Sequence, residues 1–366
     1  MIAFGPMSIS LLIGALQGSV LAALLWRTKA NRRANRFLAL LILGVVSLTI
    51  PYIIGYAGFY DRWPWLSFAP FSYTMAFGPL LYFHVACLTD PHHGRVWPHF
   101  VPVLLQFLSD AIAFPLPLAA KNWWDGVAHA PYIAPFFELA TLLSILIYGG
   151  FAFRNYRRYR IWLGETRADG VDFDPGWVRN FLIALLGVVL VWSGFFVANQ
   201  INPARNYFDQ FALYLLFALL VIYLGVEGWR NAATQFPQRE SEANDASEPE
   251  SSRDWKGLAQ DWSARIDAEA LWQQPDLTLA SLARHLGTNT AYLSRAFNEG
   301  LGENFNATIN RRRVAAVQQW LLNPGDQRDM MTLAFDAGFS SKASFNRAFA
   351  DFAGMSPSVW RLKSKI

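Results

Sequence analysis

The sequence predicts an all-α protein in two parts. A bundle of seven transmembrane helices comes first, and a soluble domain of two helix-turn-helix units joined by a long helix follows. Three observations lead to this prediction. The 366 residues are 53% hydrophobic and only 16% charged, whereas soluble domains carry roughly 25% charged residues. Charged residues are sparse up to residue 231 and frequent from residue 254 onward. Within the second part, a short sequence pattern occurs twice.

The predicted domain boundaries follow these changes in composition. Residues 1–231 form the membrane domain, which we expect to be a sensor, residues 232–253 a flexible acidic linker, and residues 254–366 the soluble domain. Within the linker, residues 235–253 are rich in acidic residues, proline and serine, and Phe236 is their only large apolar residue. Such a composition buries too little apolar surface to offset the entropy lost on ordering.

Seven apolar runs occupy the first part, and each is long enough to cross a bilayer, which takes about 20 residues of helix. The runs are apolar on all sides rather than along one stripe; residues 38–46, for example, have no polar face. The predicted spans are Met7–Trp26, Phe37–Phe59, Leu66–Thr89, Phe100–Leu118, Tyr132–Phe153, Val178–Ala198 and Gln210–Trp229.

The orientation of the bundle is predicted from the basic residues of its loops. Lysine and arginine concentrate after the first, third, fifth and seventh spans and are few in the other loops. Cytoplasmic loops carry such an excess of positive charge. We therefore expect the N-terminus outside and the C-terminal domain in the cytoplasm.

Polar residues inside the predicted spans are costly in hydrocarbon and usually face the bundle interior. One interpretation is a ligand pocket that opens outward. The alternative is a set of hydrogen bonds between helices that fixes the bundle. The residues concerned are Gln106, Asp110, Glu138, Asn199 and Gln200.

Catalysis has no support in the sequence. We find no Ser/His/Asp or Cys/His set, no glycine-rich phosphate loop and no metal-ligand cluster, and the chain has a single cysteine, Cys87. The prediction is a protein that is not an enzyme and has no catalytic residue, cofactor or metal site.

The second part shows the signals of two helix-turn-helix units. Residues 279–286 form an amphipathic helix that Gly287 ends, and Asn289 caps a second helix that begins at Thr290. A longer helix is predicted over residues 305–322. The same arrangement then recurs, with helices over 331–337 and 342–351 separated by a turn at Gly338.

Six motifs in this part resemble the DNA-binding domain of AraC/XylS-type regulators. They are Leu282-Ala-Arg-His-Leu-Gly287, Tyr292-Leu-Ser-Arg-Ala-Phe297, Asn310-Arg-Arg-Arg313, Leu333-Ala-Phe-Asp-Ala-Gly-Phe339, Phe345-Asn-Arg-Ala-Phe349 and Gly354-Met-Ser-Pro-Ser-Val-Trp-Arg361. The membrane part, especially Gly78-Pro-Leu-Leu-Tyr-Phe83, resembles the multi-span sensor segments that some members of the family carry. In that family two recognition helices enter successive turns of the major groove.

The resemblance implies which residues contact DNA. Arginine can hold guanine and asparagine adenine through paired hydrogen bonds, whereas contacts to phosphate position the domain without reading sequence. The residues expected to contact bases are Ala291, Ser294 and Arg295 in the first unit and Lys342, Ala343, Asn346 and Arg347 in the second. Those expected to contact phosphate are Thr290, Arg311, Arg312 and Ser341.

Together these expectations describe a one-component transcriptional regulator embedded in the bacterial inner membrane, which is crossed several times. Its expected partners are double-stranded promoter DNA, the lipid bilayer, an unidentified small molecule or membrane signal, a second copy of the chain and RNA polymerase. The alternatives are a transporter or membrane enzyme with a regulatory DNA-binding tail, and a bundle that only anchors the DNA-binding domain.

Overall fold

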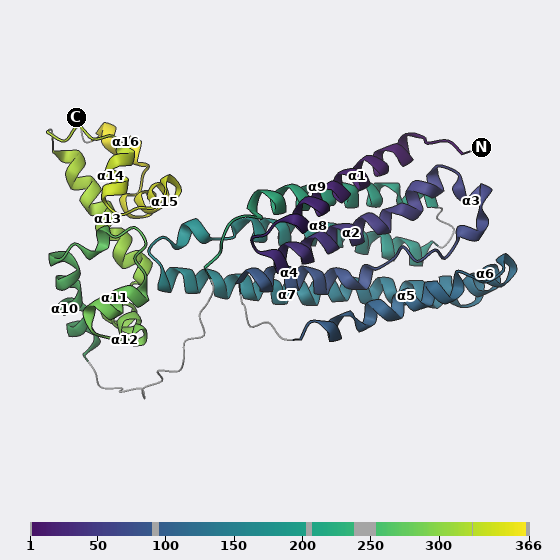
Figure 1. Ribbon diagram of the computed structural model, residues 1–366, viewed down its shortest axis with the longest axis horizontal. Helices are drawn as coiled ribbons and strands as arrows, with labels where there is room; N and C mark the ends of the chain where they lie inside the picture. The colour runs from purple at the N-terminus through teal and green to yellow at the C-terminus, as the bar shows by residue number, and fades with distance from the viewer. Residues whose placement is uncertain (1, 90–94, 203–206, 238–253, 324, 364–366) are drawn as a thin grey trace. The chain divides into compact units, whose positions relative to one another are not determined.

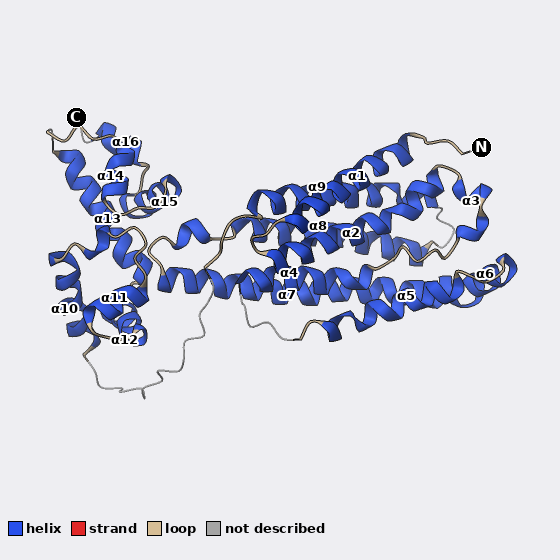
Figure 2. Cartoon of the chain, in the orientation of Figure 1, coloured by secondary structure: helices blue, strands red, loops and turns tan. Residues whose placement is uncertain are grey.

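The structure is a computed structural model that describes residues 2–89, 95–202, 207–237, 254–323 and 325–363. Its regular elements within these ranges are helices, as Figures 1 and 2 show. The contacts divide the chain into two units. The bundle unit comprises residues 1–156 and 175–238, and the C-terminal unit comprises residues 157–174 and 239–366. A segment between two predicted spans therefore belongs with the C-terminal unit.

The bundle unit is built from long apolar helices connected by short helical turns. Its helices are α1 (Pro6–Arg27), α2 (Arg32–Tyr56), α3 (Phe59–Arg62), α4 (Phe77–Thr89), α5 (Val101–Ala113), α6 (Leu118–Trp124), the first part of α7 (Ala134–Thr166), α8 (Gly176–Ile201) and α9 (Phe211–Asn231). The π-helix Asp125–Ile133 joins α6 to α7.

Five helices of the described residues, not seven, are long and apolar enough to cross a membrane. They are Pro6–Arg27, Arg32–Tyr56, Leu118–Thr166, Gly176–Ile201 and Phe208–Asn231. The predicted spans Leu66–Thr89 and Phe100–Leu118 instead contain the 13-residue helices α4 and α5. A helix of 13 residues is about 20 Å long, shorter than the roughly 30 Å hydrocarbon core.

Backbone constraints explain why these two helices are short. Before α4 the chain passes Phe68, whose φ of 64° is left-handed, and Pro70. The ammonium group of Lys121 donates to the carbonyl oxygens of Trp65 (2.6 Å) and Ser67 (2.9 Å) in this stretch. After α5, Pro115 and the second proline two residues later prevent the helix from continuing. An apolar run alone did not reveal these interruptions.

Glycines allow α1 and α9 to pack closely. A Cβ atom at Gly14 would lie 2.6 Å from Cβ of Ala218, and one at Gly18 would lie 2.2 Å from Cγ1 of Val221. Small residues spaced in this way let two membrane helices approach backbone to backbone. The contact joins the first and last helices of the bundle unit.

The start of the predicted linker 232–253 is fixed to α2. The Asn31 side chain donates to the carbonyl oxygen of Thr234 at 2.6 Å, and the Asn35 side chain donates to that of Ala232 at 3.0 Å. Phe236 is buried. The rest of the predicted linker, from residue 238, lies outside the described residues.

The C-terminal unit contains two small hydrophobic cores connected by one long helix. Its helices are the end of α7, α10 (Trp255–Ala268), α11 (Leu279–Leu286), α12 (Thr290–Arg295), the π-helix Ala296–Leu301 that continues α12, α13 (Phe305–Leu322), α14 (Met330–Asp336), α15 (Lys342–Ala353) and α16 (Pro357–Lys363). Helix α13 has the bounds predicted from the sequence and contributes Phe305 and Ile309 to the first core and Val314 and Val317 to the second.

Candidate nucleic-acid interface

The first helix-turn-helix unit consists of α11 and α12. Thr278 and Ser281 form a reciprocal capping box at the start of α11, and Gly287 ends that helix with a φ of 72°. The side-chain oxygen of Asn289 then accepts a hydrogen bond from the backbone N–H of Tyr292 at 2.7 Å. These caps pair backbone groups that a helix end leaves unpaired, so the tight turn between the helices is encoded locally.

The second unit, α14 and α15, repeats this construction. Asp329 caps α14 and Ser341 caps α15, where its hydroxyl accepts from the backbone N–H of Ser344 at 3.1 Å. The turn passes through Gly338, whose φ is 88°. A Cβ atom there would lie 2.5 Å from the carbonyl oxygen of Gln273. Glycine is therefore required both by the backbone conformation and by the close approach of the Gln273 segment.

Helix α15 presents its four predicted base-contacting residues together. Lys342, Ala343, Asn346 and Arg347 are exposed, whereas Phe345 on the opposite side is fully buried, together with Phe349. Lys342 and Asn346 are four residues apart, as are Ala343 and Arg347, and positions four residues apart lie on the same side of a helix. The structure thus places two side chains capable of paired hydrogen bonds to bases, those of Asn346 and Arg347, on one exposed face.

Helix α12 presents its predicted residues less freely. Ala291 is exposed, and Ser294 is partly buried. The guanidinium of Arg295 donates to the carboxylate of Glu299 at 2.7 Å and lies 4.8 Å from the ring centre of Trp255. Arg295 therefore has to leave an ion pair and an aromatic ring before it can contact a base.

The predicted phosphate contacts lie at separate places. Thr290 begins α12 and Ser341 caps α15. Arg311 is exposed and pairs with Glu303. Arg312 donates to the carboxylate of Asp267 at 2.7 Å and is largely buried. The two arginines thus have intramolecular partners, and their contacts to phosphate stay a prediction.

Arg313, the third arginine of this run, has a different position. Its side chain is 0% exposed. It donates to the carbonyl oxygens of Trp272 at 2.8 Å and Gln274 at 2.7 Å and stacks near Phe339. Burial lowers the pKa of its guanidinium to about 10, while the nearby Asp169 acts in the opposite direction. Arg313 connects α13 to the segment before α11 and to the second helix-turn-helix unit.

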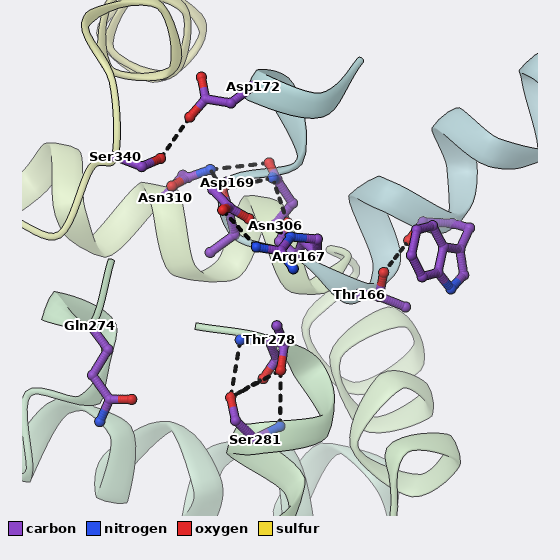
Figure 3. Close-up of polar contacts among 12 residues, drawn as sticks. Thr166, Arg167, Asp169, Asp172, Gln274, Thr278, Ser281, Asn306, Asn310 and Ser340 are labelled. Carbon is purple, nitrogen blue, oxygen red and sulfur yellow. Dashed lines mark hydrogen bonds and ion pairs between the residues drawn. The ribbon is translucent and has the colours of Figure 1, made fainter. Parts of the chain in front are cut away.

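A second feature that the sequence analysis missed is residues 167–174, which follow α7 and pack on the C-terminal unit. Figure 3 shows this segment beside α13 and the loop that carries Ser340. Arg167 and Thr278 form an antiparallel β-bridge. Ala168 is buried in the first core, and its carbonyl oxygen accepts from the side chains of Asn306 (3.0 Å) and Asn310 (2.9 Å). No local pattern in residues 167–174 indicated this packing.

The predicted polar site of the bundle is distributed over three helices. Gln106 and Asp110 lie on α5, Glu138 on α7, and Asn199 and Gln200 on α8. Gln200 is exposed, and the side-chain oxygen of Asn199 is buried without a hydrogen-bond partner among the residues that the structure describes.

Two of these polar residues hold helices together. Gln106 is buried, donates to the hydroxyl of Thr74 at 3.0 Å and accepts from the backbone N–H of Met75 at 3.0 Å. Glu138 accepts from the indole N–H of Trp192 on α8 at 2.7 Å. These contacts fit the interpretation in which polar side chains fix the bundle. A ligand pocket formed by all five residues stays a prediction.

Comparison with known proteins gives similarity in the C-terminal part. Residues 282–363 match a helix-turn-helix domain family. An uncharacterized HTH-type transcriptional regulator of Staphylococcus aureus is 33% identical over 86 residues, which are 24% of this chain and 11% of that protein. The chain thus spans a small part of the length of these staphylococcal relatives. A solved structure of a protein with unknown function from Listeria innocua is 24% identical, covers 29% of this chain and 96% of its own, and has a TM-score of 0.26.

A second relative is similar over most of its own length. The HTH-type transcriptional activator AarP of Providencia stuartii is 30% identical over 104 residues, which are 27% of this chain and 76% of AarP. The family match over residues 282–363 begins within α11 and extends through α12, α14 and α15. The chain therefore belongs to the helix-turn-helix transcriptional regulators, and its C-terminal helix-turn-helix domain is of the AraC type.

Proposed function

We propose that the chain is a membrane-embedded one-component transcriptional regulator whose C-terminal unit binds promoter DNA in a sequence-specific manner. The observation that carries this proposal is the face of α15, where Lys342, Ala343, Asn346 and Arg347 are exposed together at the start of a capped helix. A recognition helix contacts base edges with residues near its N-terminus.

The chemistry of that face suits base recognition. The guanidinium of Arg347 can donate to O6 and N7 of guanine, and the amide of Asn346 can pair with N6 and N7 of adenine. In the first unit, Ala291 and Ser294 offer little hydrogen-bonding capacity, and Arg295 is engaged with Glu299. The second unit therefore supplies most of the direct base recognition.

Membrane insertion is supported by the five long apolar helices. Residues 157–174 and the domain from residue 254 pack in one hydrophobic core. The two segments must therefore lie on the same side of the bilayer, which supports a defined orientation of the bundle in the membrane. Five spans, like seven, place the two termini on opposite sides. With the basic residues that flank α7, this favours the N-terminus outside and the C-terminal unit in the cytoplasm.

In this proposal the bundle unit responds to a small molecule or a change in the membrane, and the C-terminal unit changes its binding to DNA. Gln106, Asp110, Glu138, Asn199 and Gln200 are the candidate residues for the response, because polar groups at membrane depth often serve function. A second copy of the chain would supply a further pair of helix-turn-helix units, and RNA polymerase is the partner through which an activator would act.

The test uses the full-length chain in lipid nanodiscs and a library of sheared genomic duplexes. Selection of bound fragments followed by footprinting is expected to give protected patches about 10.5 base pairs apart, because two recognition helices enter successive turns of the groove. The variant Asn346→Ala with Arg347→Ala is expected to lose sequence preference at one patch and to keep the other. Binding without any sequence preference, or no binding, would contradict the proposal and favour a transporter or membrane enzyme.

A further inference from the structure

Residues 167–174 form a defined structure on the C-terminal unit, which we name the clasp. Its first residues are built into that unit: Arg167 pairs with Thr278 in a β-bridge, and Ala168 is buried at 1% exposure. The guanidinium of Arg167 also binds both carboxylate oxygens of Asp169, at 2.7 Å and 2.8 Å. Asp169 itself is buried. The clasp is therefore held on the C-terminal unit by main-chain pairing and apolar burial, while the Arg167–Asp169 ion pair lies within the clasp itself.

The far end of the clasp reaches the start of the second recognition helix. The carboxylate of Asp172 accepts a hydrogen bond from the hydroxyl of Ser340 at 2.6 Å (Figure 3). It accepts a second hydrogen bond from the hydroxyl of Ser341 at 2.5 Å. Ser341 is the N-cap of α15. A negative charge at a helix N-terminus is favourable because the unpaired N–H groups and the helix dipole attract it.

The hydroxyl of Ser341 has only one proton to donate. In the structure it donates this proton to Asp172, while its oxygen accepts from the backbone N–H of Ser344. A DNA phosphate is likewise an acceptor, so it requires the same proton. Phosphate and carboxylate also repel each other at contact distance. Asp172 and a phosphate group therefore cannot occupy this position together.

The clasp also borders the predicted base-contacting residue Arg347. A cleft of about 220 Å³ is lined by Arg347 and Asp351 of α15, by Asn306 of α13, and by residues of the α7 end and the clasp. Asp174, another lining residue, forms an ion pair with Arg160 at 3.0 Å. Two carboxylates, those of Asp174 and Asp351, thus line the same cleft as Arg347.

We propose that the clasp is an intrachain competitor of DNA, in which Asp172 takes the place of a backbone phosphate at the N-terminus of α15. This inference rests on the proposed function, since it assumes that Ser341 contacts phosphate when the domain binds DNA. The closed clasp holds the second helix-turn-helix unit in a state that binds DNA weakly, and DNA binds after the Asp172 carboxylate has left.

The clasp also gives the bundle a covalent route to the DNA-binding residues. Helix α7 starts at Ala134 in the bundle unit, and its last residues, from Arg157, belong to the C-terminal unit. The clasp follows α7 directly. A displacement of α7 can therefore reach Asp172 through neighbouring residues of the chain, without passing through residues 238–253.

The first experiment measures the affinity of the full-length chain in nanodiscs for sheared genomic duplex DNA at fixed salt. The variant Asp172→Asn is compared with Asp261→Asn, which removes the same charge from an exposed position of α10, outside the clasp and the two recognition helices. We expect Asp172→Asn to bind about tenfold more tightly than Asp261→Asn, because a charge-assisted hydrogen bond no longer opposes DNA.

Equal affinities of the two variants would overturn the clasp while leaving the proposed function intact. If the wild type and both variants fail to bind any duplex, the proposed function itself is wrong and the inference fails with it. Tight binding by Asp172→Asn alone would support both.

A second experiment closes the clasp chemically. Asp172→Cys and Ser340→Cys are combined with Cys87→Ser and joined by a short thiol cross-linker that a reductant can cleave. We expect cross-linking to weaken binding of the genomic duplexes at least tenfold and reduction to restore it. Unchanged binding after cross-linking would overturn the proposal, as would failure of the two cysteines to cross-link in the DNA-free protein.

Discussion

The buried guanidinium of Arg313 donates from Nε to the carbonyl oxygen of Trp272 at 2.8 Å and thereby joins the long helix α13 to the segment that precedes the first helix-turn-helix unit. Its Nη2 donates to the carbonyl oxygen of Gln274, and its plane lies near the ring of Phe339 in the second unit. One side chain thus contacts both halves of the DNA-binding domain.

The variant Arg313→Ala is expected to destabilise the C-terminal unit by about 3 kcal/mol. The reason is that two carbonyl oxygens, those of Trp272 and Gln274, lose a charged donor, and that a cavity forms where the buried Arg313 side chain was. The measurement is hydrogen exchange of the amides of α13 and α15 in the full-length protein. Arg311→Ala is the control, because Arg311 is exposed and its pair with Glu303 contributes less than about 1 kcal/mol. Equal effects of the two substitutions would contradict this role of Arg313.

The turns of the two helix-turn-helix units are expected to tolerate alanine differently. Gly287→Ala introduces a Cβ into open space and costs only the left-handed backbone conformation, about 1 kcal/mol. Gly338→Ala adds a contact of 2.5 Å to the carbonyl oxygen of Gln273. Its loss of unfolding free energy should therefore exceed that of Gly287→Ala by at least about 1 kcal/mol. Thermal unfolding of the two variants, side by side, checks the order; the reverse order would refute it.

The Asp326–Arg328 pair predicts a dependence of stability on acid pH. Hydrogen bonds from Arg328 lower the pKa of Asp326 from 3.8 to about 2. A carboxyl group whose pKa is lower in the folded state than in the unfolded state stabilises the folded state at pH values above its unfolded pKa. This stabilisation is lost as the pH falls through the pKa of the folded state. The difference in unfolding midpoint between the wild type and Asp326→Asn should therefore shrink between pH 4 and pH 2.

The same pair provides its own control. Arg328→Met removes the cause of the shift, so Asp326→Asn in that background should change the unfolding midpoint by the same amount at every pH in this range. A pH-dependent difference in the Arg328→Met background would assign the effect to another group.

The two candidate arginines are expected to differ in DNA binding. Arg347→Ala should weaken binding to a selected site by about 1–3 kcal/mol and relax the preference at one base pair. Arg295→Ala should cost less, because Arg295 must first leave Glu299 and Trp255. Binding curves for the selected site and for single-base variants of it separate the two effects, with Arg265→Ala as the control for lost charge. A larger loss for Arg295→Ala would invert the proposed order.

Local signals in the sequence predict the DNA-binding units well. Glycine at the turns, capping residues at Asn289 and Ser341, and the apolar periodicity of α13 each act within a few residues, and the structure contains the corresponding helices. The buried arginine was also detectable in principle. Arg313 falls on the stripe of Phe305, Ile309 and Val317, which has a spacing of four residues and faces the core.

Other features depend on contacts that sequence reasoning does not resolve. The number of long apolar helices was wrong because Phe68, Pro70 and Pro115 interrupt runs that hydropathy treats as continuous. The clasp was missed because Asn306 and Asn310 bind the main-chain carbonyl oxygen of Ala168. A carbonyl oxygen is present at every position, so such contacts have no signature in residue type, and about 140 residues separate the partners.

Because Ala168 packs in the first core, the folded DNA-binding domain includes residues of the segment 157–174 as well as those from Asp254 onward. A fragment that starts at Asp254 would expose the apolar surface around Leu277 and Phe305 and leave the amides of Asn306 and Asn310 without the carbonyl oxygen they bind. Proteolysis within residues 238–253 would cut the chain and still leave the domain attached, since residues 157–174 remain continuous with α7 and α8. Release from the membrane would require two events, the cut and the dissociation of the clasp.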